Sequence, residues 1–170
     1  MTVYAPRNVR KSIIKNLATL FGDATKWTSK FNVYYDADMQ AGTTPTRPAV
    51  YILNFGNLFE TKHLPAIVVL PSFRHRAHEL GSRWGHCDLE LHVFGRTLDE
   101  ADDVAGAIMH HISSWTMYDY ASGSASEQGG TSIDGDWAMV YVPLGTEFER
   151  EGTFDNWAAI SCSFPVPYFT

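Results

Sequence analysis

The segment His86–Phe94 alternates between apolar and polar side chains, and this alternation constrains the fold more than any other feature of the chain. Its apolar set is Cys87, Leu89, Leu91 and Val93, and its polar set is His86, Asp88, Glu90 and His92. Because successive side chains of a strand point to opposite faces, the pattern predicts a strand with one face on a core and the other in water or against a polar partner. A register shift of one residue would bury Asp88 and Glu90, so the orientation is strongly specified.

The residues that follow this strand are typical of a helix start. Thr97 and Glu100 form a capping box, in which the Thr97 hydroxyl accepts from the backbone N–H of Glu100 and the Glu100 carboxylate accepts from the N–H of Thr97. Negative charge near the positive end of the helix dipole comes from Asp99, Glu100, Asp102 and Asp103. Apolar residues at steps of three and four then predict a helix over Leu98–Ser114. This stripe consists of Leu98, Ala101, Val104, Ala105, Ile108, Ile112 and Trp115.

The remaining patterns predict one more helix and several more strands. Helical spacing of apolar residues predicts a helix over Asn8–Phe21, closed by Gly22. Further strands are expected at Phe31–Tyr35, Ala49–Phe55, Ala66–Leu70 between two prolines, Trp137–Leu144 and Ala158–Val166. Asp36–Pro48 is expected to be a loop, and Thr146–Asn156 is charged and turn-rich. The order predicts a single α+β domain over residues 1–170, with a mostly antiparallel sheet of about five strands and two amphipathic helices packed on it.

Composition and charge narrow the class of protein. The chain has 170 residues and a net charge of −6, from 13 Lys and Arg against 19 Asp and Glu. An acidic protein has no electrostatic reason to bind phosphate backbones, although an acidic channel would let DNA slide without sticking. Two cysteines do not form a disulfide scaffold. The longest apolar run, Ala66–Leu70, is far shorter than a membrane helix, so we expect a soluble intracellular protein without a membrane partner.

The search for chemistry yields no convincing active site. The sequence contains no phosphate-binding loop, dinucleotide fingerprint or nucleophile elbow. Cys87 and Cys162 alternate with core residues, which favours small buried hydrophobes over nucleophiles. His75, His78, His86 and Cys87 lie near one another in sequence, and a metal site built on them is the alternative to solvated loop histidines. We therefore expect no enzyme activity, no catalytic or metal-binding residues and no cofactor.

The order of the predicted elements along the chain is itself informative. An amphipathic helix and a strand precede a proline-flanked strand, LPAIVVLP; a long polar loop, the alternating strand CDLELHVF and the acidic-capped helix RTLDEADDVAGAIMHHI follow. This order, over about Asn8 to Ile112, resembles the tail terminator, or tail-completion, proteins of long-tailed bacteriophages. The resemblance implies a small subunit that assembles into a ring, expected to be a hexamer. Such a ring caps the tail tube, stops its polymerisation and presents the surface on which the head connector docks.

The resemblance also assigns roles to two groups of residues. The polar strand face and the acidic helix start are candidates for subunit contacts or channel lining: Asp88, Glu90, His92, Asp99, Glu100 and Asp103. Plain solvent exposure explains them equally well. The glycine- and serine-rich segment Tyr118–Asp136 is expected to be a long loop or hairpin arm that orders on a partner or stays disordered. Its candidate contact residues are Tyr118, Tyr120, Glu127, Asp134 and Asp136.

The expected partners are other copies of the chain, the tail tube protein and a head connector or stopper protein. DNA is expected to pass through the channel without specific binding. The protein would be located in the virion, in the tail or neck, after assembly in the host cytoplasm. Two alternatives remain open. One is another neck component, a head–tail adaptor or stopper, and the other is a small metal-binding protein or enzyme.

Overall fold

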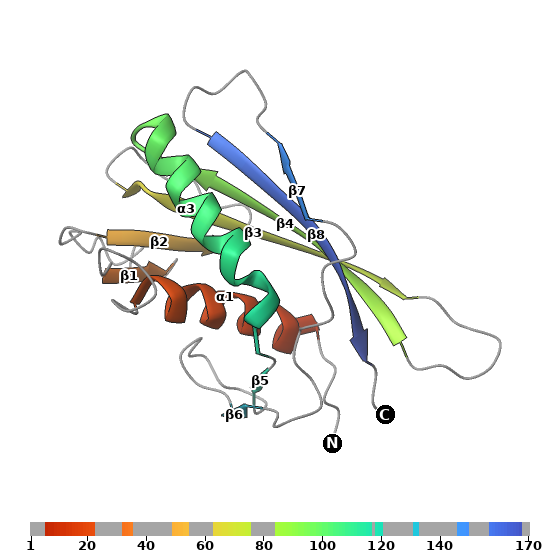
Figure 1. Cartoon of the computed structure of the whole chain (residues 1–170). Coiled ribbons are helices and arrows are strands. Elements are labelled where there is room, and N and C mark those ends of the chain that lie inside the picture. Colours follow the sequence, from red (N-terminus) through yellow and green to blue (C-terminus); the bar gives the residue numbers. More distant parts are fainter. Residues whose placement is uncertain are drawn as a thin grey trace.

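The structure is a computed structural model in which one face of a mixed sheet is covered by two helices (Figure 1). It describes residues 6–22, 32–35, 49–54, 63–75, 84–116, 118–120, 131–132, 146–149 and 157–167. The helices in this part of the chain are α1 (Pro6–Gly22), α3 (Leu98–His111) and the short 3-10 helix η2 (Ile112–Ser114). The strands are β1 (Asn32–Tyr35), β2 (Ala49–Asn54), β3 (Ala66–His75), β4 (Trp84–Phe94), β5 (Tyr118–Asp119), β6 (Thr131–Ser132), β7 (Thr146–Glu149) and β8 (Trp157–Pro167).

The main sheet has the strand order β1-β2-β3-β4-β8-β7, and β5 pairs separately with β6. The predicted α+β fold with two helices on one sheet is confirmed, and five of the predicted strands occur in that sheet. The sheet is mixed: β3–β4, β4–β8 and β7–β8 are antiparallel, as expected, whereas β1–β2 and β2–β3 are parallel. Parallel neighbours need a crossover of about a dozen residues. Residues 36–48 and 55–65 provide the length for two such crossovers, a signal that the strand patterns themselves do not carry.

Two strand predictions need revision at the level of single elements. β3 does not stop before Pro71 but continues to His75, still paired with β4. The pairing with β2 ends at Val69, so Pro71 lies where β3 has become an edge strand, and proline is tolerated there. β7 forms in Thr146–Glu149, where the sequence indicated turns. The predicted strand Trp137–Leu144 lies outside the described residues.

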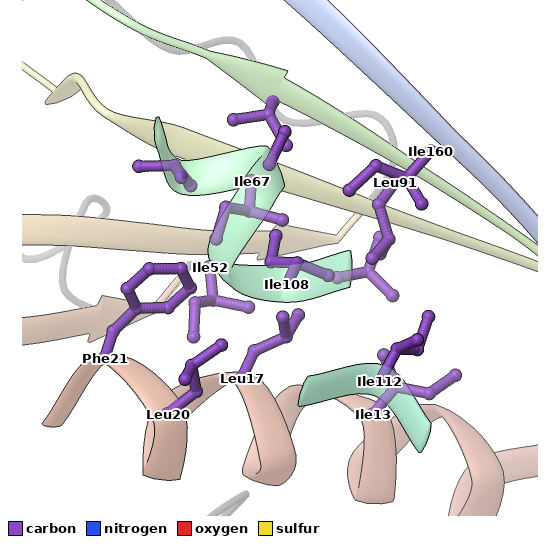
Figure 2. Close-up of a cluster of buried hydrophobic side chains, with 14 of the residues drawn as sticks. Ile13, Leu17, Leu20, Phe21, Ile52, Ile67, Leu91, Ile108, Ile112 and Ile160 are labelled. Atoms are coloured by element: carbon purple, nitrogen blue, oxygen red, sulfur yellow. The ribbon is translucent and has the colours of Figure 1, made fainter. Parts of the chain in front are cut away.

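The core lies between the helices and one face of the sheet, as the alternation in β4 predicts. Leu89, Leu91 and Val93 are buried, and they belong to the same cluster as the apolar residues of both helices. Figure 2 shows this arrangement: Ile13 and Leu17 of α1 and Ile108 of α3 approach strand side chains such as Ile67 and Leu91. α1 contacts β1, β2 and β3, whereas α3 contacts β4 and β8. The two helices therefore divide one sheet face between them.

Both predicted helical stripes are buried. Every apolar residue on which the α1 prediction rests is in the core: Val9, Ile13, Ile14, Leu17, Leu20 and Phe21. In α3 and the turn after it, Ala101, Val104, Ala105, Ile108, Ile112 and Trp115 are buried, and only Leu98 is half-buried. No helix in the described part of the chain is long and apolar enough to cross a membrane.

A close approach at Gly95 sets the turn from β4 into α3. A Cβ atom there would lie 2.5 Å from the Thr97 carbonyl oxygen and 2.7 Å from the Ala101 nitrogen. No side chain fits that gap without a backbone shift. Gly95 therefore allows α3 to fold back directly over the sheet that β4 belongs to.

Candidate functional site

The predicted cap of α3 forms, but its carboxylate has a different donor from the one expected. The backbone N–H of Glu100 donates to the Thr97 hydroxyl at 3.2 Å, as the capping box predicts. The Glu100 carboxylate, however, accepts from the backbone N–H of Arg96 at 2.7 Å instead of from Thr97. The Arg96 guanidinium also donates to both carboxylate oxygens. The bidentate ion pair draws the carboxylate one residue further back, which sequence spacing alone did not indicate.

This pairing shifts both pKa values. Burial alone would raise the pKa of Glu100, but hydrogen bonds from the side chain and backbone of Arg96 outweigh it, so the pKa of Glu100 is lowered. The hydrogen bond to Glu100 raises the pKa of Arg96 despite partial burial. Glu100 therefore stays ionised and bound to Arg96. It belongs to the frame of the helix start, in contrast to Asp99 and Asp103, whose side chains are exposed on α3.

The predicted polar side chains of β4 lie on the sheet face opposite the helices. Glu90 is exposed, Asp88 and His92 are half-buried, and the His92 Nε2 atom contacts the Glu90 carboxylate. Because Leu89, Leu91 and Val93 face α3, alternation puts this row on the other face. The structure therefore separates the predicted residues into two surfaces. We call Asp88, Glu90 and His92 the outer row, and Asp99, Asp103, Gly106, Met109 and His110 the α3 face.

The outer row borders an apolar region on the same sheet face. The register aligns His92 with Val68 on β3 and with Ala159 on β8. Val68 belongs to a second buried cluster, together with Ala49, Tyr51, Leu53 and Ala66. In this region the rings of Tyr34 and Tyr51 stack with their centroids 5.1 Å apart. The polarity of this sheet face thus changes between β3 and β4.

The first residues of the predicted arm are fixed to α1. The two ends of the segment pair as a short antiparallel ladder, with Tyr118 opposite Ser132. Tyr120 is only 1% exposed, and its hydroxyl donates to the Lys11 carbonyl oxygen at 3.2 Å. The Lys15 ammonium lies 4.1 Å from the centroid of the half-buried Tyr118 ring, in cation–π geometry. The structure thus places both tyrosines at the base of the arm. Glu127, Asp134 and Asp136 lie outside the described residues.

The side chains of α1 that hold the base of the arm were not predicted from the sequence. Asn16 donates to the Thr116 carbonyl oxygen at 2.7 Å and accepts from its N–H at 2.9 Å. Ser12 accepts from the Tyr118 N–H at 2.9 Å and donates to its carbonyl oxygen at 3.3 Å. The Asn8 side chain accepts from the Tyr120 N–H at 3.4 Å. We call Asn8, Ser12 and Asn16 the polar row of α1.

The spacing of the polar row of α1 explains how side chains of a helix can form hydrogen bonds with the backbone of an extended chain. Residues four apart on a helix are separated by about 6.0 Å along its axis. Alternate residues of an extended chain are separated by about 6.6 Å. Asn8, Ser12 and Asn16 therefore meet alternate residues of the segment, much as an edge strand would. Polar residues at i, i+4 and i+8 beside an apolar stripe were the sequence signal for this contact.

Of the four residues behind the metal alternative, His78 lies outside the described residues. His75 is aligned with Gly85 and His86 with Arg74 in the β3–β4 register. Among the side chains that the structure describes, no three His, Cys, Asp or Glu residues converge on one point. A small cavity between the ends of α1 and η2, lined in part by Asn16, His111 and Trp115, measures about 30 Å³. That volume suits one water molecule, not a metabolite.

Comparisons with known proteins leave the resemblance to tail terminators as an inference from element order alone. No protein-family model matches the sequence, and no curated protein is significantly similar to it.

Proposed function

We propose that this protein is a structural virion protein whose copies form a ring on the end of a phage tail tube. The ring ends tube growth and provides the surface to which the head connector or stopper binds. The expected ring is a hexamer. The protein would carry no catalytic centre or cofactor, and its place would be the tail or neck of the virion.

The observation that carries this proposal is the order of the described elements. α1 is followed by β1, β2 and β3, then by β4, and α3 starts directly after β4. The resemblance to tail terminators rests on this order without β1. The two helices lie side by side on one sheet face, and the sheet leaves an outer row of polar side chains on the opposite face. Such a subunit has distinct faces for its neighbours and for a channel.

The charges of the described surface support a channel that does not hold DNA. The exposed acidic side chains are Glu90 on the outer row and Asp99 and Asp103 on the α3 face. With a net charge of −6, a ring of several copies repels phosphate groups. DNA would therefore pass the ring without specific binding. Either acidic surface could line the channel, and the other would then face a partner.

A tube-growth assay tests the proposal. Purified tail tube protein is allowed to polymerise with and without this protein, and tube lengths are measured by electron microscopy. We expect tubes capped at one end and lengths that stop increasing once the ends are occupied. The Thr19 side chain is exposed on α1, and its hydroxyl donates to the Lys15 carbonyl oxygen of the same helix. Thr19→Ala is therefore the control, and it should cap tubes as the natural chain does. Unchanged tube growth together with binding to head connectors would identify an adaptor or stopper instead.

The arm is tested separately, by deleting residues 123–130 between the two ends of the β5–β6 ladder. Because the polar row of α1 holds the base of the arm, the shortened chain should still fold. We expect tails that assemble but join heads poorly, measured as the fraction of tails attached to heads. Normal joining would show that the arm contacts no essential partner.

A further inference from the structure

Gly106 lies in the middle of α3, where the described part of the chain gives no structural reason for a glycine. It is exposed, and a Cβ atom at this position would meet nothing within 4 Å. A glycine inside a helix weakens it by about 1 kcal/mol relative to alanine. Gly95 has a close approach to explain it, but the described surroundings of Gly106 offer none. A close approach by another molecule would supply the missing reason.

The residues around Gly106 form a face suited to a partner. Asp99 and Asp103 precede it, and Met109 and His110 follow it, all exposed. Met109, at 36%, is the large apolar side chain that the described part of the chain leaves exposed. On a helical projection with 100° per residue, these side chains lie within about 60° of Gly106. The face therefore has an acidic N-terminal half, a flat centre and a C-terminal half with methionine and histidine.

We propose that the α3 face binds the α3 face of a second copy of this chain, with the helices antiparallel and crossing at Gly106. A two-fold axis then brings each residue before Gly106 opposite a residue equally far after it. Asp103 lies about 4.5 Å before the centre and His110 about 6 Å after it, on the same side of the face. Asp103 of each copy therefore meets His110 of the other.

Charge and shape both favour a second copy of the chain as the partner of the α3 face. An imidazole N–H can donate to a carboxylate whether or not the ring is protonated, and protonation strengthens the contact. Antiparallel helices also align their dipoles favourably. The missing side chain at Gly106 lets the backbones approach, and the contact shields Met109 of each copy from water beside the half-buried Asp102 of the other. His110 already packs edge-on against His111, with ring centroids 4.9 Å apart, which helps to hold its ring in place.

The contact goes beyond the proposed ring, whose neighbours must meet through two different surfaces. An α3–α3 pair is isologous, so it joins two free chains or pairs two rings, whichever the protein forms. The helix is only about 21 Å long, so the interface is small and the dissociation constant is expected on the order of 100 µM.

Sedimentation of the whole chain between about 10 µM and 1 mM tests the contact. We expect the average molecular mass to rise over this range, from near that of one unit toward that of two. Gly106→Ala should raise the dissociation constant about tenfold, because two methyl groups enter the crossing point. The same change should raise the melting temperature measured at low concentration by about 3 °C, because alanine favours the helix. Thr19→Ala, on α1, should leave the association unchanged.

A charge exchange identifies the partner surface. Asp103→Lys and His110→Asp should each weaken association about tenfold, because each contact occurs twice across the two-fold axis. The double variant restores opposite charges at the same two places and should recover most of the affinity. Circular dichroism checks that every variant keeps its helix content. A chain whose mass stays constant up to 1 mM overturns the proposal, as does an association unaffected by Gly106→Ala or not restored in the double variant.

Discussion

At the scale of single residues, the helix start depends on Glu100 more than on its acidic neighbours. Glu100 accepts from the N–H and the guanidinium of Arg96, whereas Asp99 is exposed. We expect Glu100→Gln to lower the free energy of unfolding at pH 7 by about 1 kcal/mol. Asp99→Asn should cost only about 0.3 kcal/mol, because it loses only the interaction with the helix dipole. Urea denaturation of both variants measures the difference.

The lowered pKa of Glu100 makes its contribution depend on pH. A carboxylate whose pKa is lower in the folded state stabilises the fold above its unfolded pKa of about 4.5. That stability is lost as the pH falls through the lower folded value. The difference in unfolding free energy between the natural chain and Glu100→Gln should therefore be full at pH 6 and shrink as the pH falls below about 4. A difference that grows on acidification would contradict the assigned pairing.

Two adjacent residues of β4 test the orientation of the strand. Leu91 is 0% exposed between the sheet and the helices, and Glu90 is exposed on the outer row. Leu91→Ala should lower the free energy of unfolding by about 3 kcal/mol, because it removes buried surface and leaves a cavity. Glu90→Ala should change it by less than about 0.5 kcal/mol. A larger loss for Glu90→Ala than for Leu91→Ala in thermal or urea unfolding would mean that the two faces are exchanged, and similar losses would mean that neither face is selectively buried.

At the scale of elements, α1 serves two neighbours: the core on one side and the chain after η2 on the other. Ser12 is fully buried and bonds both the N–H and the carbonyl oxygen of Tyr118. Ser12→Ala would leave both groups without this partner, so we expect a loss of about 2 kcal/mol. Hydrogen exchange should accelerate most at the Tyr118 amide. Thr19→Ala is the control, and uniform acceleration across the chain would show that Ser12 does not act locally.

The elements also show what could be predicted from the sequence. Periodicity identified α1, α3 and the two faces of β4, because a buried face requires a regular pattern. The parallel pairing of β1, β2 and β3 was not predicted, because it depends on the path of the segments that connect these strands. β7 escaped because a four-residue strand at the edge of a sheet carries little hydrophobic pattern. The Arg96 pairing escaped because a local motif does not include its side-chain neighbours.

The candidate site was predictable only in part for the same physical reason. Asp99 and Asp103 lie on the exposed helix face that their spacing indicates, and Asp88, Glu90 and His92 share one face of β4. Their separation onto opposite sides of the sheet follows from how β4 and α3 pack, which no single segment encodes. The roles of these residues as subunit contacts or channel lining remain predictions.

At the scale of the whole molecule, the net charge of −6 should keep the assembled protein off nucleic acid. We expect no retardation of double-stranded DNA in gel electrophoresis at physiological salt, because the described acidic surfaces repel phosphate. The acidic surfaces of several ring copies should reinforce this repulsion. Binding that strengthens as the salt concentration falls would instead indicate a basic surface on the assembly.

The most direct test of the account is to image this protein together with its tail tube. Light scattering after size exclusion gives the mass of the assembly, and negative-stain microscopy of the same sample shows its shape and position. We expect a ring with a central hole, seated at one end of the tube. A protein that remains monomeric with tube ends in excess, and that leaves those ends bare, would contradict it.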